Sequence, residues 1–268
     1  MKETGFNLTC DVLYPNSAAA LSISANTEFE LSVHSWLIQM DGLNILVDTG
    51  IGNFKERPFS ALFNKLNNPF IERFNQTGVT PEQIDYVLLT HLHTAHIGWN
   101  TYLKNGKWYP TFPNARYLAP KKDLEFLFTD QGSNRRILFD DSLLPLITHN
   151  QLTVLPPEGG EVLPGIEFIP SPGHSVGHMS IKLRSDQQIA YFSGDIMHNA
   201  VQVLAPDVSS TFCFDIAQTN QTRKEFLSQA ISERAVIFTA HFDKTSAGKI
   251  QQTAEGNEWV YLEPTDKK

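Results

Sequence analysis

The chain has almost no cysteine. Cys10 and Cys213 are its two thiols among 268 residues, and they lie far apart in the sequence. Secreted domains held together by disulfides carry many more cysteines, and thiolate zinc sites need closely spaced pairs such as CxxC. A disulfide framework and a CxxC metal site are therefore excluded, and we expect both thiols to be reduced and structural.

Long apolar runs and clusters of basic residues are also missing. No stretch approaches the roughly 20 apolar residues that span a bilayer, and the opening MKETGFNLTC lacks the basic-then-apolar pattern of a signal peptide. The 21 Lys and Arg residues are outnumbered by 29 Asp and Glu residues, which gives a formal charge of −8. Because nucleic-acid phosphates are bound by clustered cations, we expect a cytoplasmic protein that binds neither nucleic acid nor membrane.

What the chain does contain is typical of a globular α/β protein. Hydrophobic residues make up 41% of the sequence, which is enough to form a full core. A length of 268 residues suits one domain with insertions, and we take residues 1–268 as that domain. Groups of strands alternate with helices along the chain, and this order suggests two sheets between helical layers.

Local signals indicate where some of these elements lie. Asp41-Gly42 separates two strand-like segments and predicts a hairpin. The segment AVIFTAH is expected to be the strand that closes the main pattern. An insertion or cap at about residues 58–78 is expected to be one broken helix or two short ones, since apolar residues recur there at helical spacing: Phe59, Leu62, Phe63 and Leu66.

Three histidines stand together in THLHTAH, after the buried strand-like segment YVLLT. On an extended loop, side chains two residues apart point the same way, so His91 and His93 can offer two imidazoles to one ion. His96 lies round the following turn and can serve a neighbouring position. This spacing predicts a metal-binding loop.

Three more candidate ligands follow. His174 lies in PSPGHSVGH, Asp195 ends the segment YFSGD, and His241 ends the segment FTAH. Taken singly, His241 would be a packing residue and Asp195 a turn residue. Together with the histidine loop they favour a metal site, because imidazoles and one shared carboxylate suit Zn²⁺ and similar first-row ions.

The segments HLHTAH, PGHSVGH, SGD and TAH, in this order, resemble the metallo-β-lactamase fold superfamily, whose first motif is HxHxDH. The resemblance covers almost the whole chain and implies an α/β fold, the αββα four-layer sandwich. It further implies a binuclear zinc centre, with manganese, cobalt or iron as alternatives. His91, His93 and His174 would hold the first metal, Asp195 would bridge both metals, and the remaining histidines would hold the second: His96 and His241.

One residue departs from this motif. The aspartate expected between the second and third histidines is Ala95, and a methyl group cannot bind a metal. Three explanations are open: an inactivated active-site variant of an enzyme, a mononuclear or water-completed natural enzyme, and a pseudoenzyme that has kept the fold. Because all the other ligands are present, we favour an active-site variant whose second metal position is weakened.

Two further segments, GDIMHNAVQV and HIGWN, resemble the branch that contains methyl parathion hydrolase and related lactonases. His198 stands where related lactonases place a tyrosine near the substrate carbonyl, which implies a hydrogen-bonding or electrophilic role; a structural His198 is the alternative. Asp48 in LVDTG resembles the superfamily's aspartate that orients metal-binding histidines, with a turn-capping aspartate as the alternative. Trp99, which follows the metal loop, is the aromatic residue that we expect to touch the substrate.

The resemblance implies a metal-dependent hydrolase that cleaves lactones or carboxylic and aryl esters by attack of a metal-bound hydroxide. Asp195 would orient the water and shuttle its proton, and Ala95 would impair turnover. The alternatives are an organophosphate triester hydrolase of the methyl parathion hydrolase type and a catalytically inactive ligand-binding protein. The expected partner is a small-molecule ester or lactone, and a homodimer is compatible with the sequence.

Overall fold

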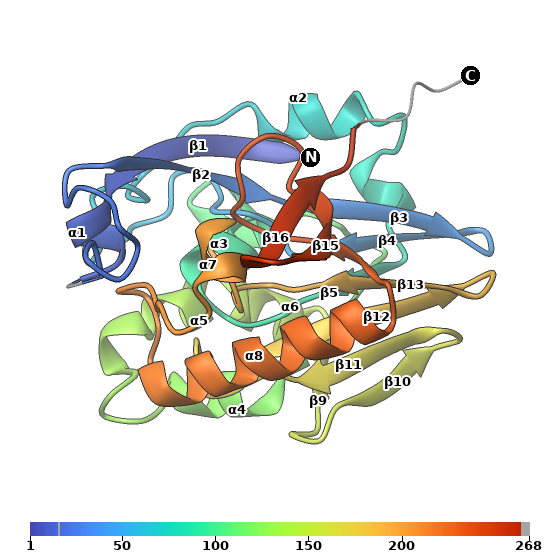
Figure 1. Cartoon of the computed structure of the whole chain (residues 1–268). Helices are drawn as coiled ribbons and strands as arrows, with labels where there is room; N and C mark the ends of the chain where they lie inside the picture. The colour runs from blue at the N-terminus through green and yellow to red at the C-terminus, as the bar shows by residue number, and fades with distance from the viewer. Residues whose placement is uncertain (16, 264–268) are drawn as a thin grey trace. The chain divides into compact units, whose positions relative to one another are not determined.

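A computed structural model describes residues 1–15 and 17–263 (Figure 1). The chain divides into two compact units, each with its own sheet. Unit 1 consists of Met1–Thr4 and Val33–Pro157, and unit 2 consists of Gly5–Ser32 and the chain from Glu158 onward. The chain passes between the units within β1 (Lys2–Thr9) and β2 (Glu28–His34), which form a two-stranded sheet.

Unit 1 contains a mixed five-stranded sheet in the order β3-β4-β5-β8-β9. β3 and β4 are antiparallel, and the other neighbouring strands run parallel. The predicted hairpin at Asp41-Gly42 is confirmed: both residues have positive φ, 50° and 77°, which two-residue hairpin turns require. The strands are β3 (Trp36–Met40), β4 (Leu43–Val47), β5 (Tyr86–Leu88), β8 (Arg116–Pro120) and β9 (Leu152–Leu155), with a separate hairpin of β6 (Thr101–Lys104) and β7 (Lys107–Pro110).

The helices of unit 1 are short. Of the one broken helix or two short helices expected at about residues 58–78, a single short helix forms, α2 (Phe70–Asn75). Over Phe59–Leu66 the expectation is wrong, because turns such as Ser60 N–H to Arg57 C=O and Phe63 N–H to Ser60 C=O form there instead. Leu62 is exposed, so this apolar spacing does not bury one helical face. The helical segments are α2 (Phe70–Asn75), η1 (Pro81–Gln83), α3 (Thr94–Ile97), η2 (Gly98–Asn100), α4 (Lys121–Phe126), η3 (Ser133–Arg135), α5 (Ile137–Ser142) and α6 (Leu144–Thr148).

Unit 2 contains a seven-stranded sheet whose strands lie in sequence order from β10 to β16. Every neighbouring pair is antiparallel except β13 and β14, which are parallel. The chain does not close its pattern at AVIFTAH as expected, since a further hairpin follows. The strands are β10 (Gly160–Leu163), β11 (Ile166–Pro170), β12 (Met179–Ser185), β13 (Gln188–Phe192), β14 (Val236–Phe238), β15 (Ala247–Thr253) and β16 (Gly256–Tyr261).

The helices of unit 2 are α1 (Cys10–Leu13), α7 (Val201–Leu204) and α8 (Ile216–Ser232), the long orange helix of Figure 1. Asp215 caps α8, because its side chain accepts a hydrogen bond from the Gln218 amide. Phe226, Leu227 and Ala230 of α8 pack into a buried cluster with Tyr191 and Ile237 of the sheet. Burial of this apolar face therefore holds α8 against the strands of unit 2.

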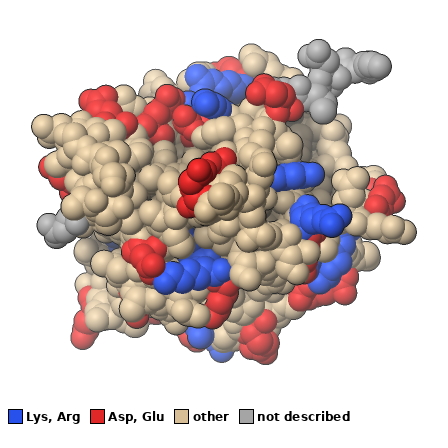
Figure 2. Space-filling model, viewed as in Figure 1, with Lys and Arg blue, Asp and Glu red and all other residues tan. Residues whose placement is uncertain are grey.

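The two cysteines are free thiols, as expected. Among the described residues, no helix combines the length and the apolar composition that crossing a bilayer requires. On the face drawn in Figure 2, basic and acidic side chains are interspersed, and neither sign forms a broad patch.

Candidate metal centre

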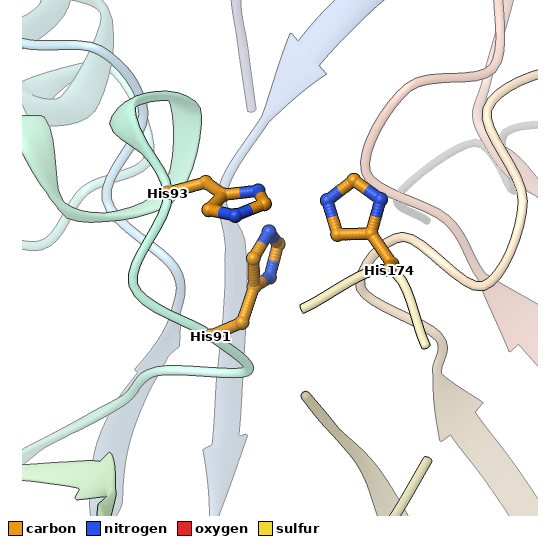
Figure 3. A group of neighbouring side chains, drawn as sticks. All are labelled: His91, His93 and His174. Atoms are coloured by element: carbon orange, nitrogen blue, oxygen red, sulfur yellow. The ribbon is translucent and has the colours of Figure 1, made fainter. Parts of the chain in front are cut away.

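Unit 1 brings its three predicted ligands together at the end of β5. His91 and His93 follow this strand on a loop, and the single turn of α3 returns the chain so that His96 lies beside them. The ring centroid of His91 is 4.7 Å from that of His93 and 4.0 Å from that of His96. Figure 3 shows the adjacent rings of His91 and His93. These residues form the unit 1 cluster.

Asp48 fixes the orientation of this cluster. It follows β4, which runs parallel to β5, and its φ of 54° is unusual for a residue other than glycine. Its carboxylate accepts hydrogen bonds from the backbone N–H and the hydroxyl of Thr90, both at 2.8 Å, and lies 2.8 Å from His96 Nδ1. Asp48 therefore does what the sequence interpretation expected of it, in that it orients a histidine by hydrogen bonding.

The same bonds determine which nitrogen each ring presents. A carboxylate only accepts, so His96 Nδ1 carries a proton and Nε2 is the basic nitrogen. The Thr90 hydroxyl gives its proton to Asp48, so at 3.0 Å it accepts from His91 Nδ1, which leaves Nε2 basic in His91 as well. Both rings thus present the nitrogen that a metal ion needs, because a protonated nitrogen cannot bind one.

Unit 2 brings together its own candidate ligands, which define the unit 2 cluster: His174, Asp195, His198 and His241. His174 follows β11, Asp195 follows β13 and His241 follows β14. These three strands run in the same direction, because β11 and β13 are both antiparallel to β12 and β13 is parallel to β14. Their carboxyl ends therefore meet at one edge of the sheet.

One oxygen lies at the centre of the unit 2 cluster. Asp195 Oδ2 is 3.2 Å from His174 Nε2, 3.2 Å from His241 Nε2 and 3.5 Å from His198 Nε2. All four side chains are buried. His241 Nδ1 donates to the Ser32 carbonyl at 2.7 Å, so its basic nitrogen is the one that faces Asp195.

The spacing of these donors suits a metal ion. In a tetrahedral site with bonds of about 2.0–2.1 Å, neighbouring ligand atoms lie about 3.3 Å apart. The contacts of 3.2 Å that Asp195 Oδ2 makes with His174 Nε2 and His241 Nε2 match this value. Imidazole nitrogens and one carboxylate oxygen are also the donor set that Zn²⁺ accepts. The residues therefore fit the predicted metal.

His198 differs from the other rings of the unit 2 cluster. Burial lowers its pKa, an effect that the hydrogen bond to Asp195 opposes, so burial favours the neutral ring. Its Nδ1 is buried and has no hydrogen-bond partner among the described residues, whereas Nε2 lies 3.5 Å from Asp195 and 3.4 Å from the Ser210 hydroxyl. The proton is therefore favoured on Nε2, where it can be donated.

Trp99 lies in unit 1 and is 5% exposed. Its indole N–H donates to Glu3 at 2.9 Å, and its ring stacks on Phe70 with a centroid separation of 4.7 Å. Burial raises the pKa of Glu3 against the hydrogen bonds that it accepts. Trp99 also lines a cavity of about 410 Å³ in unit 1, together with Tyr102 and Phe54. Contact between Trp99 and a substrate stays a prediction.

Two residues that the sequence patterns did not single out support the clusters. Thr90 links Asp48 to His91, as described above. His178 accepts a hydrogen bond from the Asp195 backbone N–H at 2.9 Å. The signal for His178 was the second histidine of PGHSVGH, but spacing alone does not show what a buried ring contacts.

The segment around His174 also matches the G-x-S-x-G spacing of serine hydrolases, with Ser175 at its centre. In those enzymes the serine stands on a sharp turn between a strand and a helix. Here the segment lies on a loop between β11 and β12. The geometry therefore does not support a nucleophilic serine at this position.

Comparison with known proteins places these residues in a family context. The family model described as "Metallo-beta-lactamase superfamily" matches residues 29–241. The N-acyl homoserine lactonase AiiA of Bacillus thuringiensis subsp. kurstaki is 24% identical over 190 residues. That alignment covers 64% of this chain and 66% of AiiA, slightly less than two thirds of the relative's length.

Solved structures show the same fold. The hydrolase AbOPH "in beta lactamase superfamily" has a TM-score of 0.81 and 19% identity, with 99% of this chain and 94% of that chain covered. AidC, a "Dizinc Quorum-Quenching Lactonase" in complex with a product, has a TM-score of 0.79, 19% identity and the same coverage. The α/β fold class expected from the sequence is therefore confirmed.

Proposed function

The chain belongs to the metallo-β-lactamase superfamily, since the family match covers residues 29–241, and on that premise we propose that it is a metal-dependent hydrolase of lactones or carboxylic esters. The observation that carries the proposal is the arrangement around Asp195, whose Oδ2 lies 3.2 Å from the Nε2 atoms of both His174 and His241. The family match contains both clusters, which supports their use in one centre.

Each predicted ligand has a proposed place in that centre. His91, His93 and His174 would hold one zinc ion, and His96 and His241 would hold a second, with Asp195 as the carboxylate ligand. The neutral donor set of the unit 1 cluster and the single carboxylate of the unit 2 cluster support this assignment. Since Ala95 supplies no carboxylate, we propose that the second position binds its ion more weakly. The likeness in fold to AidC, a dizinc lactonase, supports zinc as the ion.

The bound metal would supply a water of lowered pKa and a Lewis acid that polarises the substrate carbonyl. Asp195 would orient that water and accept its proton. His198 donates its Nε2–H to the oxygen on which negative charge develops, because burial favours the neutral ring and no described residue accepts from Nδ1. Asp48 holds His96 in the orientation that presents Nε2.

The lactone and ester class is supported by the names of AiiA and AidC, both lactonases at low identity. A lactone and an ester present the same electrophile, a carbonyl carbon that carries an alkoxy leaving group. The same attack would serve phosphate triesters, so an organophosphate is a useful comparison substrate. A metal-binding protein without turnover is the alternative that Ala95 favours.

The test measures hydrolysis of an aliphatic γ-lactone, p-nitrophenyl acetate and a p-nitrophenyl phosphate triester by the purified chain. We expect cleavage of the lactone or the carboxylic ester that is lost after treatment with a chelator and restored by zinc. Cleavage that persists in the chelator would overturn metal dependence. Bound zinc without cleavage of any of the three substrates would instead identify an inactive binding protein.

A further inference from the structure

His178 closes the loop that carries His174. The Ser171 backbone N–H donates to the His178 carbonyl at 2.9 Å, and the Ser171 hydroxyl lies 2.8 Å from His178 Nδ1. These two contacts join the ends of the segment Ser171–His178, with His174 near its middle. The His178 ring therefore makes one of the two contacts that close this loop, and the other is a backbone hydrogen bond.

The other nitrogen of the same ring reaches a second candidate ligand. The Asp195 backbone N–H donates to His178 Nε2 at 2.9 Å. A backbone N–H can only donate, so Nε2 is the unprotonated nitrogen and Nδ1 carries the proton. Nδ1–H then donates to the Ser171 hydroxyl, which fixes the tautomer of His178. The ring is 1% exposed, so water does not readily replace either partner.

The turn that carries Asp195 needs such a restraint. It follows β13, and its middle residue, Gly194, has a φ of 52°, a conformation that other residues rarely adopt. The Asp195 carboxylate stands only 3.2 Å from His174 Nε2. A shift of the Asp195 backbone would therefore change the separation of two ligand atoms that must both reach one ion.

Other contacts anchor the His174 loop to a different part of unit 2. The Thr222 hydroxyl of α8 donates to the Pro172 carbonyl at 2.7 Å. The Phe214 and Asp215 amides, just before α8, donate to the carbonyls of His174 and Gly173. These bonds would remain in a variant without the His178 imidazole. Loss of the ring would thus disturb the position of Asp195 more than the folding of the loop.

We infer that His178 is a positioning residue that sets Asp195 relative to His174 and thereby controls metal affinity. The inference rests on the proposed function, because it assumes that His174 and Asp195 bind a metal. His178 itself is not a metal ligand in this proposal, because both of its ring nitrogens form hydrogen bonds. In many metalloproteins, residues that hydrogen-bond to metal ligands orient those ligands, and their loss weakens metal binding about 10- to 100-fold. We assign His178 the same kind of role.

The test compares His178→Leu, which removes both hydrogen bonds, with His178→Gln, whose side-chain carbonyl can still accept from the Asp195 amide. His149→Leu is the matched control, because His149 is an exposed histidine of unit 1. Zn²⁺ affinity is measured by competition with a chromophoric chelator, and the Co²⁺ form is examined by visible absorption. Melting of the metal-free proteins in EDTA shows whether each variant folds.

We expect His178→Leu to bind Zn²⁺ about 10- to 100-fold more weakly and to change the Co²⁺ spectrum, while His178→Gln stays close to wild type and His149→Leu matches it. Unchanged affinity and spectrum in a folded His178→Leu would overturn the inference. If that variant does not fold, Ser171→Ala decides: weaker Zn²⁺ binding supports the inference, and unchanged binding overturns it. Absence of Zn²⁺ binding by the wild-type chain would instead refute the proposed function.

Discussion

The unit 1 and unit 2 clusters contain the same ligand type but are held in different ways. In the unit 1 cluster a carboxylate, Asp48, stands behind the imidazoles and accepts from His96 Nδ1. In the unit 2 cluster the carboxylate, Asp195, lies against the basic Nε2 of His241, and the other ring nitrogen of His241 donates to a neutral group, the Ser32 carbonyl. The carboxylate thus orients a candidate ligand in unit 1, whereas in unit 2 it is itself a candidate ligand.

The proposed centre contains few negative charges. If two divalent cations bind, the proposed ligand atoms carry one negative charge, on Asp195, because the other ligands are neutral imidazoles. Asp48 hydrogen-bonds to His96 Nδ1, on the side of the ring away from the proposed metal, so it cannot replace a ligand. A second cation would thus be held with less charge compensation than the superfamily motif provides. Variants that remove or add a carboxylate test this difference between the two clusters.

The largest effect is expected from Asp195→Ala. This variant leaves the imidazoles of the unit 2 cluster without their shared carboxylate, so bound zinc and turnover should fall by more than about 100-fold, above the range for groups that only support a ligand. Elemental analysis and ester hydrolysis measure the two losses. Asp207→Ala is the control, since Asp207 forms an exposed ion pair with Lys224 and should change little.

Ala95→Asp should have the next largest effect, in the opposite direction. The substitution restores a carboxylate to the loop between His93 and His96, so zinc per chain should rise towards two and turnover by about 10-fold or more. Ala95→Asn keeps the shape without the charge and should restore less. Equal zinc content and turnover in the alanine and aspartate proteins would show that a carboxylate at position 95 contributes neither to zinc binding nor to activity.

Asp48→Ala tests orientation without loss of a ligand. It removes the acceptor of His96 Nδ1–H and of both Thr90 donors, and zinc affinity should fall about 10- to 100-fold. Asp48→Asn is the matched variant, because asparagine tolerates the positive φ and keeps one acceptor oxygen. If alanine and asparagine weaken binding equally, the carboxylate charge matters more than the geometry; if neither does, Asp48 is a turn residue only.

The smallest effect concerns a buried cation of unit 1 outside the cluster. Burial lowers the pKa of Lys55 to about 7, although Asp141 opposes the shift. The unfolded chain, with a pKa near 10.5, then binds more protons than the folded chain between pH 7 and 9, so the free energy of unfolding should rise with pH. The rise cannot exceed about 1.4 kcal/mol per pH unit for one group.

Chemical unfolding at pH 7, 8 and 9 measures this slope. Lys55→Met removes the titrating group while Arg57 still pairs with Asp141 at 2.6 Å. The slope should therefore be smaller in the variant than in the wild-type chain. An identical slope in both proteins would mean that Lys55 stays protonated through this range.

Much of the candidate centre could be predicted from the sequence, because its ligands follow strands directly. His91, Asp195 and His241 each lie three residues after the end of a strand, and such short connections leave the chain little conformational freedom. The hairpin at Asp41-Gly42 was equally local. Ligand spacing and turn-forming residues are set by a few neighbouring positions, so both features can be predicted from the sequence.

Features that depend on tertiary contacts were not predicted. Apolar spacing over Phe59–Leu66 resembles a helix, but the chain there forms turns. The segments of β15 (AGKIQQT) and β16 (GNEWVY) show little alternation of polar and apolar residues, so the sequence pattern did not predict this hairpin. The bonds of His178 join residues 17 positions apart, and sequence alone does not show which buried groups meet.

If these histidines and Asp195 form a metal centre, zinc should stay bound to the purified protein after exhaustive dialysis, and elemental analysis measures it per chain. We expect at least one tightly bound ion, with a second that is lost more readily because Ala95 supplies no ligand. A wild-type chain that retains no zinc, and takes up none when zinc is added, would contradict this expectation.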